Sequence, residues 1–172
     1  ENTEALAFYK SLYDVSPPEA INYVWFDAGT RFSQGDIGMF FWWTPYFYLT
    51  RNDGYMTDTA SVVRDPLGYG VLPKVSDDAE QTVSLGGWSL GIPSSSSQQE
   101  EAWQFVKWAT GAEAQKQMGL VPDYLYSFSD FSRASLYTDP DLLEVYPYLD
   151  LQLKILQQGN GKLVRPPAPG YT

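Results

Sequence analysis

Cysteine and histidine are both absent from this chain of 172 residues. Without them the protein cannot build a Cys–His or Ser–His catalytic centre, a zinc site of thiolates and imidazoles, or a disulfide framework. The motifs of phosphate-binding loops, dinucleotide sites, EF-hands and the GxSxG nucleophile are missing as well. The sequence therefore predicts no metal and no cofactor, and any catalysis would rest on carboxylate, serine, tyrosine or lysine side chains.

Basic residues are scarce, with 11 lysines and arginines against 21 aspartates and glutamates, and the formal net charge is −10. Such an acidic surface repels phosphates, so no nucleic-acid partner is expected. The longest apolar run, Met39 to Trp43, is far shorter than the roughly 20 residues of a membrane-spanning helix. The chain opens at Glu1 without a positively charged leader, and we expect it to be processed or cut from a longer protein.

Aromatic residues, by contrast, are abundant: the chain has 6 Trp, 13 Tyr and 9 Phe. The apolar face of a sugar ring can be desolvated against an indole or a phenol, while the ring hydroxyls need polar partners at the edge. The composition therefore favours a binding protein over an enzyme.

Hydrophobic periodicity and capping residues predict an alternation of helices and short strands. The predicted helices cover residues 4–13, 19–33, 45–51, 97–110 with Ser97 as N-cap, 112–118, and 139–158 with a break at Pro147. The predicted strands cover residues 37–41, 69–73, 82–85 and 89–92. Alternating strands and helices define the α/β class, but so few short strands make a thin sheet, which indicates part of a larger protein.

The first candidate site lies where the predicted strand 37–41 runs towards the next predicted helix. Ligands of open α/β folds bind at this carboxyl edge of the sheet, and here the sequence places Trp42 and Trp43. Because side chains alternate along a strand, one of the two indoles should face the core and the other the cleft. The alternative, that both tryptophans are core residues, stays open.

The second candidate site is the segment Gly86-Gly87-Trp88 between two predicted strands. Paired glycines in a β-rich run indicate close backbone approach or a bend, and Trp88 would add an aromatic platform beside free N–H groups. An ordinary β-bulge explains the same residues without a ligand. Arg165, in the proline-rich tail, could donate to ligand hydroxyls or form a surface salt bridge.

Three further tryptophans, Trp25, Trp103 and Trp108, fall at helical spacing on apolar faces. That pattern predicts core positions and not ligand contacts. The tryptophans predicted to bind a ligand are therefore those of the two candidate sites.

A fragment of a carbohydrate-active enzyme is the alternative from another functional class. It would need two carboxylates that face each other across a cleft, and Asp27, Asp36, Asp123 and Asp130 are possible members. Nothing in their spacing selects a pair, and solvated surface charge is the favoured explanation. The sequence thus assigns no catalytic residue. A structural module whose aromatic residues are all core is the third interpretation.

The order of motifs along the chain resembles one protein family. The motifs are Phe32-x-x-Gly35-x-x-Gly38-Met39, Gly70-Val71-Leu72-Pro73, Gly86-Gly87-Trp88-x-x-Gly91-Ile92, Glu101-Ala102-Trp103-x-Phe105-Val106-x-Trp108, and the tail Arg165-Pro166 with Pro169 and Tyr171. This series is similar to the carboxyl-terminal part of a bacterial extracellular solute-binding protein of the maltose-binding-like group, the sugar-capturing subunit of ABC importers.

The resemblance implies a two-lobed α/β fold, periplasmic-binding-protein-like of type II, of which this chain holds a composite part. Residues 1–68 would belong to the second lobe. Residues 69–120 would cross the hinge into the first lobe, and residues 121–172 would return to the second lobe with the carboxyl-terminal tail. The amino-terminal part of the same protein, with most first-lobe ligand contacts, would be missing.

The same resemblance implies that Trp43 stacks on the ligand, that Gly87 and Trp88 form a hinge-side contact, and that Arg165 adds a polar contact. The function would be capture of a sugar or polyol by hinge closure and delivery to the permease of an ABC transporter, without catalysis. The place would be the periplasm or the extracellular face of the membrane, where the absent amino terminus could carry a lipid anchor. Maltose-binding proteins have a Gly-Pro-Trp-like segment where this chain has Trp43-Thr44-Pro45, so the ligand need not be a maltodextrin.

Overall fold

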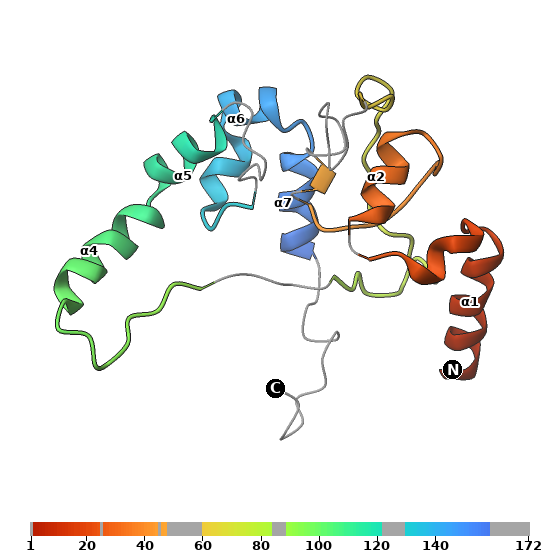
Figure 1. Cartoon of the computed structure of the whole chain (residues 1–172), viewed down its shortest axis with the longest axis horizontal. Coiled ribbons are helices and arrows are strands. Elements are labelled where there is room, and N and C mark those ends of the chain that lie inside the picture. The colour runs from red at the N-terminus through yellow and green to blue at the C-terminus, as the bar shows by residue number, and fades with distance from the viewer. Residues whose placement is uncertain are drawn as a thin grey trace. The chain divides into compact units, whose positions relative to one another are not determined.

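The computed structural model describes residues 2–24, 26–44, 46–47, 60–83, 89–121 and 130–158. The chain divides into two compact units, residues 1–68 and residues 69–172, and each is described by itself (Figure 1). The first unit contains α1 (Asn2–Asp14), the 3₁₀-helix η1 (Pro18–Asn22) and α2 (Asp27–Ser33). The second unit contains α4 (Gln99–Ala109), α5 (Ala112–Gly119), the 3₁₀-helix η2 (Ala134–Thr138), α6 (Pro140–Val145) and α7 (Leu149–Gln158). Every described helix is too short or too polar to cross a membrane.

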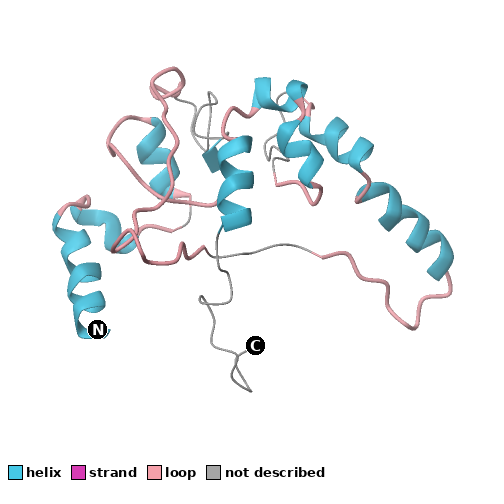
Figure 2. Cartoon of the chain, turned by 180° about the vertical axis from the view of Figure 1, so that it is seen from behind, coloured by secondary structure: helices cyan, strands magenta, loops and turns pink. Residues whose placement is uncertain are grey.

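The predicted strands do not form in the part of the chain that the structure describes, which consists of helices, turns and loops (Figure 2). Residues 37–41, 69–73, 82–83 and 89–92 have no strand pairing. A strand forms only when its N–H and C=O groups join a ladder with a neighbour, and a run of four or five residues cannot supply one alone. The α/β class is therefore not confirmed by these residues, and the predicted division into lobe segments stays a prediction.

In the first unit, α1 forms where the apolar spacing predicts it, whereas the helix predicted over residues 19–33 is divided into η1 and α2. The division falls at Tyr23, whose backbone is extended (φ −67°, ψ 133°). Next to it, the Asp27 carboxylate accepts a 2.8 Å hydrogen bond from the Val24 N–H. A carboxylate that binds a nearby backbone N–H competes with helix continuation, which explains the break.

In the second unit, local capping chemistry sets the start of α6. The Asp139 side chain accepts hydrogen bonds from two backbone N–H groups of the first turn, and a proline occupies the start of the helix. The break predicted at Pro147 is confirmed, because α6 ends before it and α7 begins after it. The Ser97 cap predicted for α4 is wrong, since Gln98 precedes this helix and makes no side-chain cap.

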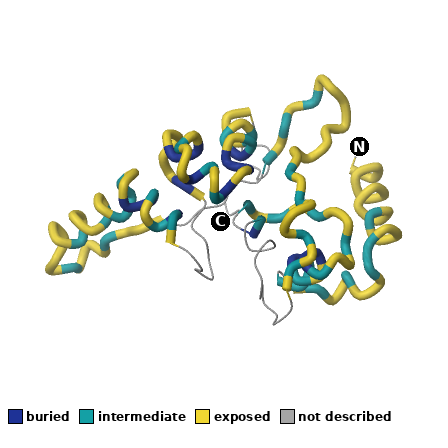
Figure 3. Tube along the Cα trace, turned by 90° about the horizontal axis from the view of Figure 1, so that it is seen from above, coloured by how far each residue is buried: buried dark blue, intermediate teal, exposed yellow. Residues whose placement is uncertain are grey.

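The core of the second unit is built by η2, α6 and α7. Figure 3 colours the buried residues of the described chain dark blue. Its largest fully buried side chains are those of Tyr146, Tyr148, Leu142, Leu149 and Gln115. Edge-on contacts join the Tyr146 ring to Tyr148 at 6.1 Å and to Phe131 at 6.4 Å between centroids. Burial of leucine and aromatic side chains supplies the main stabilisation of such a core.

The carboxyl end of α5 packs tightly on this core. The Tyr146 hydroxyl donates a 2.6 Å hydrogen bond to the Gly119 carbonyl. A Cβ atom on residue 119 would lie 2.9 Å from Leu142 Cδ2 and 3.0 Å from Phe131 Cζ. Only glycine fits without moving these side chains.

Two buried glutamines tie residues 130–132 to the helices. Gln115 of α5 donates a 2.7 Å hydrogen bond to the Ser132 hydroxyl and accepts a 2.9 Å hydrogen bond from the Ser132 N–H. Gln152 of α7 donates a hydrogen bond to the Asp130 carboxylate. Buried polar groups need hydrogen-bond partners. The two glutamine side chains supply partners to this segment, as a neighbouring strand would in a sheet.

A buried phenol completes the fixation of this segment. The Tyr137 hydroxyl donates a 2.9 Å hydrogen bond to the Phe131 carbonyl. Burial and the nearby Asp130 carboxylate raise the pKa of Tyr137 to about 12. The phenol therefore remains a hydrogen-bond donor throughout the neutral pH range.

Lys116 joins α5 to the start of α6. Its Nζ atom lies 2.8 Å from Asp139 Oδ2 and 2.7 Å from Asp141 Oδ2. The hydrogen bonds to these carboxylates raise the pKa of Lys116, and the same interaction lowers the pKa of Asp139. The ion pair thus links two helices and holds the residue that caps α6.

The apolar faces of α1 and α4 are exposed. Trp103 and Trp108 of α4 are 48% and 61% exposed, so their prediction as core residues is wrong for this structure. Leu6 and Phe8 of α1 are exposed as well. Helical spacing predicts an apolar face, but it does not predict a neighbour that covers the face. Trp25, the third tryptophan predicted as core, lies outside the described residues.

The substitution Gly119→Ala should destabilise the second unit by about 1–3 kcal/mol, because the new methyl group overlaps Leu142 and Phe131. Gly91→Ala is a matched control, since a Cβ atom at residue 91 meets nothing within 4 Å. Urea denaturation followed by circular dichroism measures both variants. Equal stability of the two would contradict the close packing at residue 119.

The substitution Lys116→Met should lower the urea midpoint at neutral pH, because the variant loses the ion pair with Asp139. The pKa of Asp139 lies below its usual 3.8 in the folded chain, so the pair stabilises the fold above that pH and loses its effect as the pH falls through the folded value. The midpoint difference between the native chain and the variant should therefore shrink below pH 3.8.

Lys154→Met, which removes an exposed lysine of α7, is the control for the loss of one positive charge. We expect this variant to keep the native midpoint. If the Lys116 variant shows a difference that does not change with pH, packing of the lysine stem and not its charge stabilises the junction of α5 and α6.

Candidate functional site

Residues 39–43 of the first unit alternate between outward and inward side chains. Met39, Phe41 and Trp43 are 89%, 67% and 56% exposed, and the intervening Phe40 and Trp42 are partly buried. A period of two is that of an extended chain with one face packed against its neighbours. Trp42 therefore faces inward and Trp43 outward, which agrees with the alternation expected for this pair.

The inward side chains form a row of aromatic rings on α2. The centroid of the buried Phe32 ring lies 4.6 Å from Phe40, and Phe40 lies 6.3 Å from Trp42. Trp42 then meets the buried ring of Tyr46 edge-on, at 6.4 Å and 79°. Phe26 also packs on Tyr46, with centroids 6.0 Å apart. The row attaches the extended segment to the helix.

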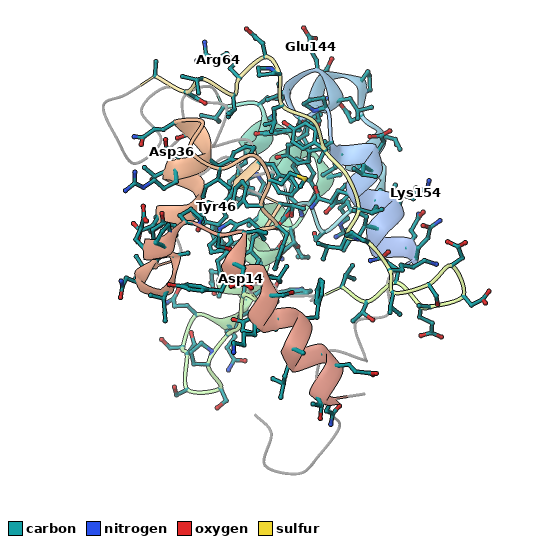
Figure 4. All side chains as sticks on the ribbon, turned by 90° about the vertical axis from the view of Figure 1, so that its right-hand side faces the viewer. Asp14, Asp36, Tyr46, Arg64, Glu144 and Lys154 are labelled. Carbon is teal, nitrogen blue, oxygen red and sulfur yellow. The ribbon has the colours of Figure 1, made fainter. Side chains whose placement is uncertain are left out.

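Trp43 is held by two rings of this row although more than half of its surface is exposed. Trp42 meets it edge-on with centroids 5.1 Å apart at 64°, and Tyr46 lies 5.9 Å away at 44°. The Tyr46 N–H also donates a 3.0 Å hydrogen bond to the Trp43 carbonyl, which closes a turn. Figure 4 labels Tyr46 among the packed side chains of this unit. The outward indole is therefore fixed in place.

An indole that is both fixed and exposed can desolvate the apolar face of a solute. Because the ring is already ordered, little rotamer freedom is lost when the solute binds. The cluster of Trp42, Trp43 and Tyr46 offers aromatic ring faces and carries no carboxylate, serine or lysine. Its chemistry therefore fits binding.

The other predicted site residues are not tested by the structure. Gly87, Trp88 and Arg165 lie outside the described residues. The structure brings Trp42 and Trp43 into contact, and the ligand-binding role of all five residues stays a prediction.

Tyr46 is the residue of this cluster that the sequence analysis missed. It is buried and contacts both tryptophans. The sequence contained a signal for it, because Tyr46 follows Trp43 by three residues in a segment predicted to begin a helix, and residues three apart share one face of a helix.

Charges in the first unit are paired around Arg31 of α2. Its guanidinium lies 3.1 Å from the Asp36 carboxylate and 3.7 Å from that of Glu19. The hydrogen bond with Asp36 raises the pKa of Arg31, while burial and the negative charge of Glu19 raise the pKa of Tyr23. This exposed group fixes the turn after α2, at which Figure 4 labels Asp36.

The carboxylates considered for an enzyme have structural partners. Asp27 binds a backbone N–H, Asp36 pairs with Arg31, and Asp130 accepts a hydrogen bond from a glutamine. Asp123 lies outside the described residues. Within the described ranges, no group of three or more acidic side chains is placed to hold a metal ion.

Comparison with known proteins gives one family and several relatives. The profile of the family described as bacterial extracellular solute-binding protein matches residues 1–116. A "Probable amino-acid ABC transporter periplasmic-binding protein" of Sinorhizobium fredii is 26% identical over 138 residues, which cover 80% of this chain and 28% of the relative. A "Probable ABC transporter-binding protein" of Deinococcus radiodurans is 25% identical over 146 residues, which cover 84% of this chain and 32% of the relative. No solved structure gives a significant match.

The chain is thus similar to part of each relative, because it spans 28% of one and 32% of the other. The matched part includes the aromatic cluster, since the family profile covers residues 1–116.

Two alanine substitutions should distinguish the contribution of the exposed Trp43 ring to stability from that of the buried Tyr46 ring. Tyr46→Ala removes a buried ring and should cost about 3 kcal/mol of unfolding free energy. Trp43→Ala removes a largely exposed ring and should cost about 1 kcal/mol. Chemical denaturation monitored by tryptophan fluorescence and circular dichroism gives both values. A larger loss for Trp43→Ala than for Tyr46→Ala would show that Trp43 is a core residue.

Proposed function

Because this chain belongs to the family of bacterial extracellular solute-binding proteins, we propose that it is part of a protein that captures a small solute for an ABC transporter. The solute in this proposal is a sugar or a polyol. Capture proceeds by closure of two lobes around the solute, and the closed form delivers it to the membrane permease.

The observation that carries the sugar proposal is the exposed indole of Trp43 on its aromatic support. Two rings hold it, at 5.1 Å and 5.9 Å, while 56% of the residue stays exposed. A sugar has an apolar C–H face that such a ring can cover, and hydroxyl groups that remain for polar partners. Trp43 is therefore the proposed stacking residue.

Gly87, Trp88 and Arg165 complete the proposed binding set. In this proposal Gly87 leaves backbone N–H groups open to the solute and Trp88 gives a second aromatic face. The Arg165 guanidinium donates hydrogen bonds to solute oxygens. Only the sequence pattern supports these three roles.

The proposed fold is the two-lobed α/β fold of periplasmic binding proteins, completed by further polypeptide of the same protein. Residues 1–68 and 121–172 belong to one lobe in this proposal, and residues 69–120 cross the hinge. The exposed apolar faces of α1 and α4 support it, because a stable protein covers such faces. The extended, two-sided apolar segment 39–43 supports it too, since a strand buried on both faces has that pattern.

The proposed place of action is the periplasm or the outer face of the cell membrane. The family description and the relatives' names support it, since they refer to extracellular and periplasmic solute-binding proteins. The permease of the transporter is the proposed macromolecular partner, and a lipid anchor would hold the protein near it.

The proposal includes no catalytic step. The described carboxylates considered for glycoside hydrolysis each hold a structural hydrogen bond or ion pair. A retaining or inverting glycosidase needs two carboxylates that are free to act on one glycosidic bond. Capture without chemistry therefore fits these residues better.

An amino acid is the second candidate solute, because the relative from Sinorhizobium fredii is named as an amino-acid transporter component. An amino acid carries a carboxylate and an ammonium group in close proximity, and both need charged or polar partners when they are desolvated. The aromatic cluster offers an apolar face, which favours the sugar.

A thermal-shift screen of the intact protein tests the proposal with monosaccharides, disaccharides, polyols and amino acids as probes. We expect a sugar or polyol to raise the melting temperature, and titration calorimetry then gives its affinity. Trp43→Ala should weaken that affinity about fivefold or more, because a stacked aromatic contact contributes about 1 kcal/mol or more. Phe41→Ala is the matched control on the same outward face and should keep the affinity.

Three results would contradict the proposal. Binding of amino acids alone would overturn the sugar assignment, and full affinity in Trp43→Ala would overturn the site. Turnover of a glycoside that one carboxylate substitution abolishes would favour the enzyme alternative instead.

A further inference from the structure

The indole N–H of Trp42 is a buried hydrogen-bond donor without an acceptor. Its Nε1 atom is inaccessible to solvent and has no hydrogen-bond partner in the structure. Tryptophan is a donor only, so this group can be satisfied by nothing but an oxygen or another acceptor. A buried polar group without a partner destabilises the fold, and such groups are rare unless they serve a function or bind a water or ligand.

The position of this donor connects it with the candidate site. The Trp42 ring meets the exposed Trp43 ring edge-on with centroids 5.1 Å apart, and it packs on the buried Tyr46 at 6.4 Å. The Trp42 ring is therefore a direct neighbour of the ring that the solute is proposed to cover. Packing alone does not account for an indole at this position, because phenylalanine would make the aromatic contacts without burying an N–H group.

We propose that the Trp42 N–H is a donor reserved for the solute: it is covered and unsatisfied in the free chain, binding of the solute shifts the covering side chains, and an oxygen of the bound solute, directly or through one ordered water, then accepts its hydrogen bond. This inference rests on the proposed function, and it adds a specificity-determining role for Trp42. The solute then has an apolar face for Trp43 and a hydroxyl or ring oxygen at its edge for Trp42. A solute without an acceptor at that edge leaves the donor unsatisfied and binds more weakly.

Nuclear magnetic resonance of the intact protein with ¹⁵N-labelled indoles tests the free state without any solute. Trp42→Phe assigns the Trp42 signal by its disappearance. We expect the N–H of free Trp42 to have the upfield proton shift of an indole without a hydrogen bond. A downfield, hydrogen-bonded shift in the free protein would overturn the proposal, because the donor would already have its acceptor.

The second arm uses the sugar or polyol that the thermal-shift screen finds, together with deoxy analogues that lack one hydroxyl each. Addition of the parent compound should move the Trp42 N–H signal downfield, and one deoxy analogue should fail to do so. Trp42→Phe should bind the parent about fivefold to tenfold more weakly and should bind that deoxy analogue as the native protein does, since a net hydrogen bond contributes about that factor.

Phe40→Leu is the matched control, because it alters the neighbouring ring of the row without touching a donor. It should keep the preference for the parent compound over the deoxy analogue. If Trp43→Ala loses the solute while Trp42→Phe keeps both affinity and preference, the donor role is overturned and the proposed function stands. If no sugar, polyol or amino acid binds, the proposed function fails and this inference fails with it.

Discussion

The edge-to-face packing of Trp42 against Trp43 and Tyr46 is the interaction on which the candidate site depends. Rings that meet edge-on attract each other through their quadrupoles beyond the gain from burial, and here the contacts span 5.1 Å and 6.4 Å. An exposed indole without such support would sample several rotamers and lose that freedom on binding. Because Phe40 links Trp42 to the buried Phe32 of α2, the position of one outward ring is determined by a row of inward ones. The candidate binding surface of one outward ring thus depends on the aromatic row behind it.

The second unit achieves the same rigidity with polar side chains. Gln115 and Gln152 bind the segment around Ser132 from two helices, and Lys116 holds the residue that caps α6. Removal of one partner from such an amide contact leaves a buried donor or acceptor unsatisfied, which costs more than a loss of contact area. The two units therefore differ in how they tolerate substitution. Replacement of one ring in the aromatic row removes part of the contact area, whereas replacement of one glutamine removes a whole hydrogen bond.

Sequence patterns predicted those features of the fold that depend on neighbours within about one helical turn. The start of a helix near Asp139, the break at Pro147 and the alternation of Trp42 and Trp43 are of this kind, because proline geometry and chain pleating act locally. Features that depend on distant residues were not predictable. A strand forms only beside a second strand, and an apolar helix face such as that of Trp103 becomes buried only against a neighbouring element. Both neighbours can lie far away in the sequence, where local spacing does not identify them. The same holds for the candidate site. Alternation along the chain predicted one outward indole, which in the structure is that of Trp43, but it did not predict the buried ring of Tyr46 that supports it.

The charge of this chain also bears on which solute the proposed site would accept. The chain carries a formal net charge of −10, and Arg31 of α2 is already paired with Asp36 and Glu19. An anionic solute that approaches this surface would be repelled by the field of the protein and would find that cation engaged. A neutral polyhydroxylated solute meets no such barrier, and the groups proposed to receive it are an apolar ring face and an indole N–H, neither of which titrates in the physiological range. These 172 residues hold no histidine, so this part of the protein has no imidazole that would gain a charge between neutral and mildly acidic pH. In the proposed site, recognition therefore depends on the shape of a ring face and on an indole donor and not on charge.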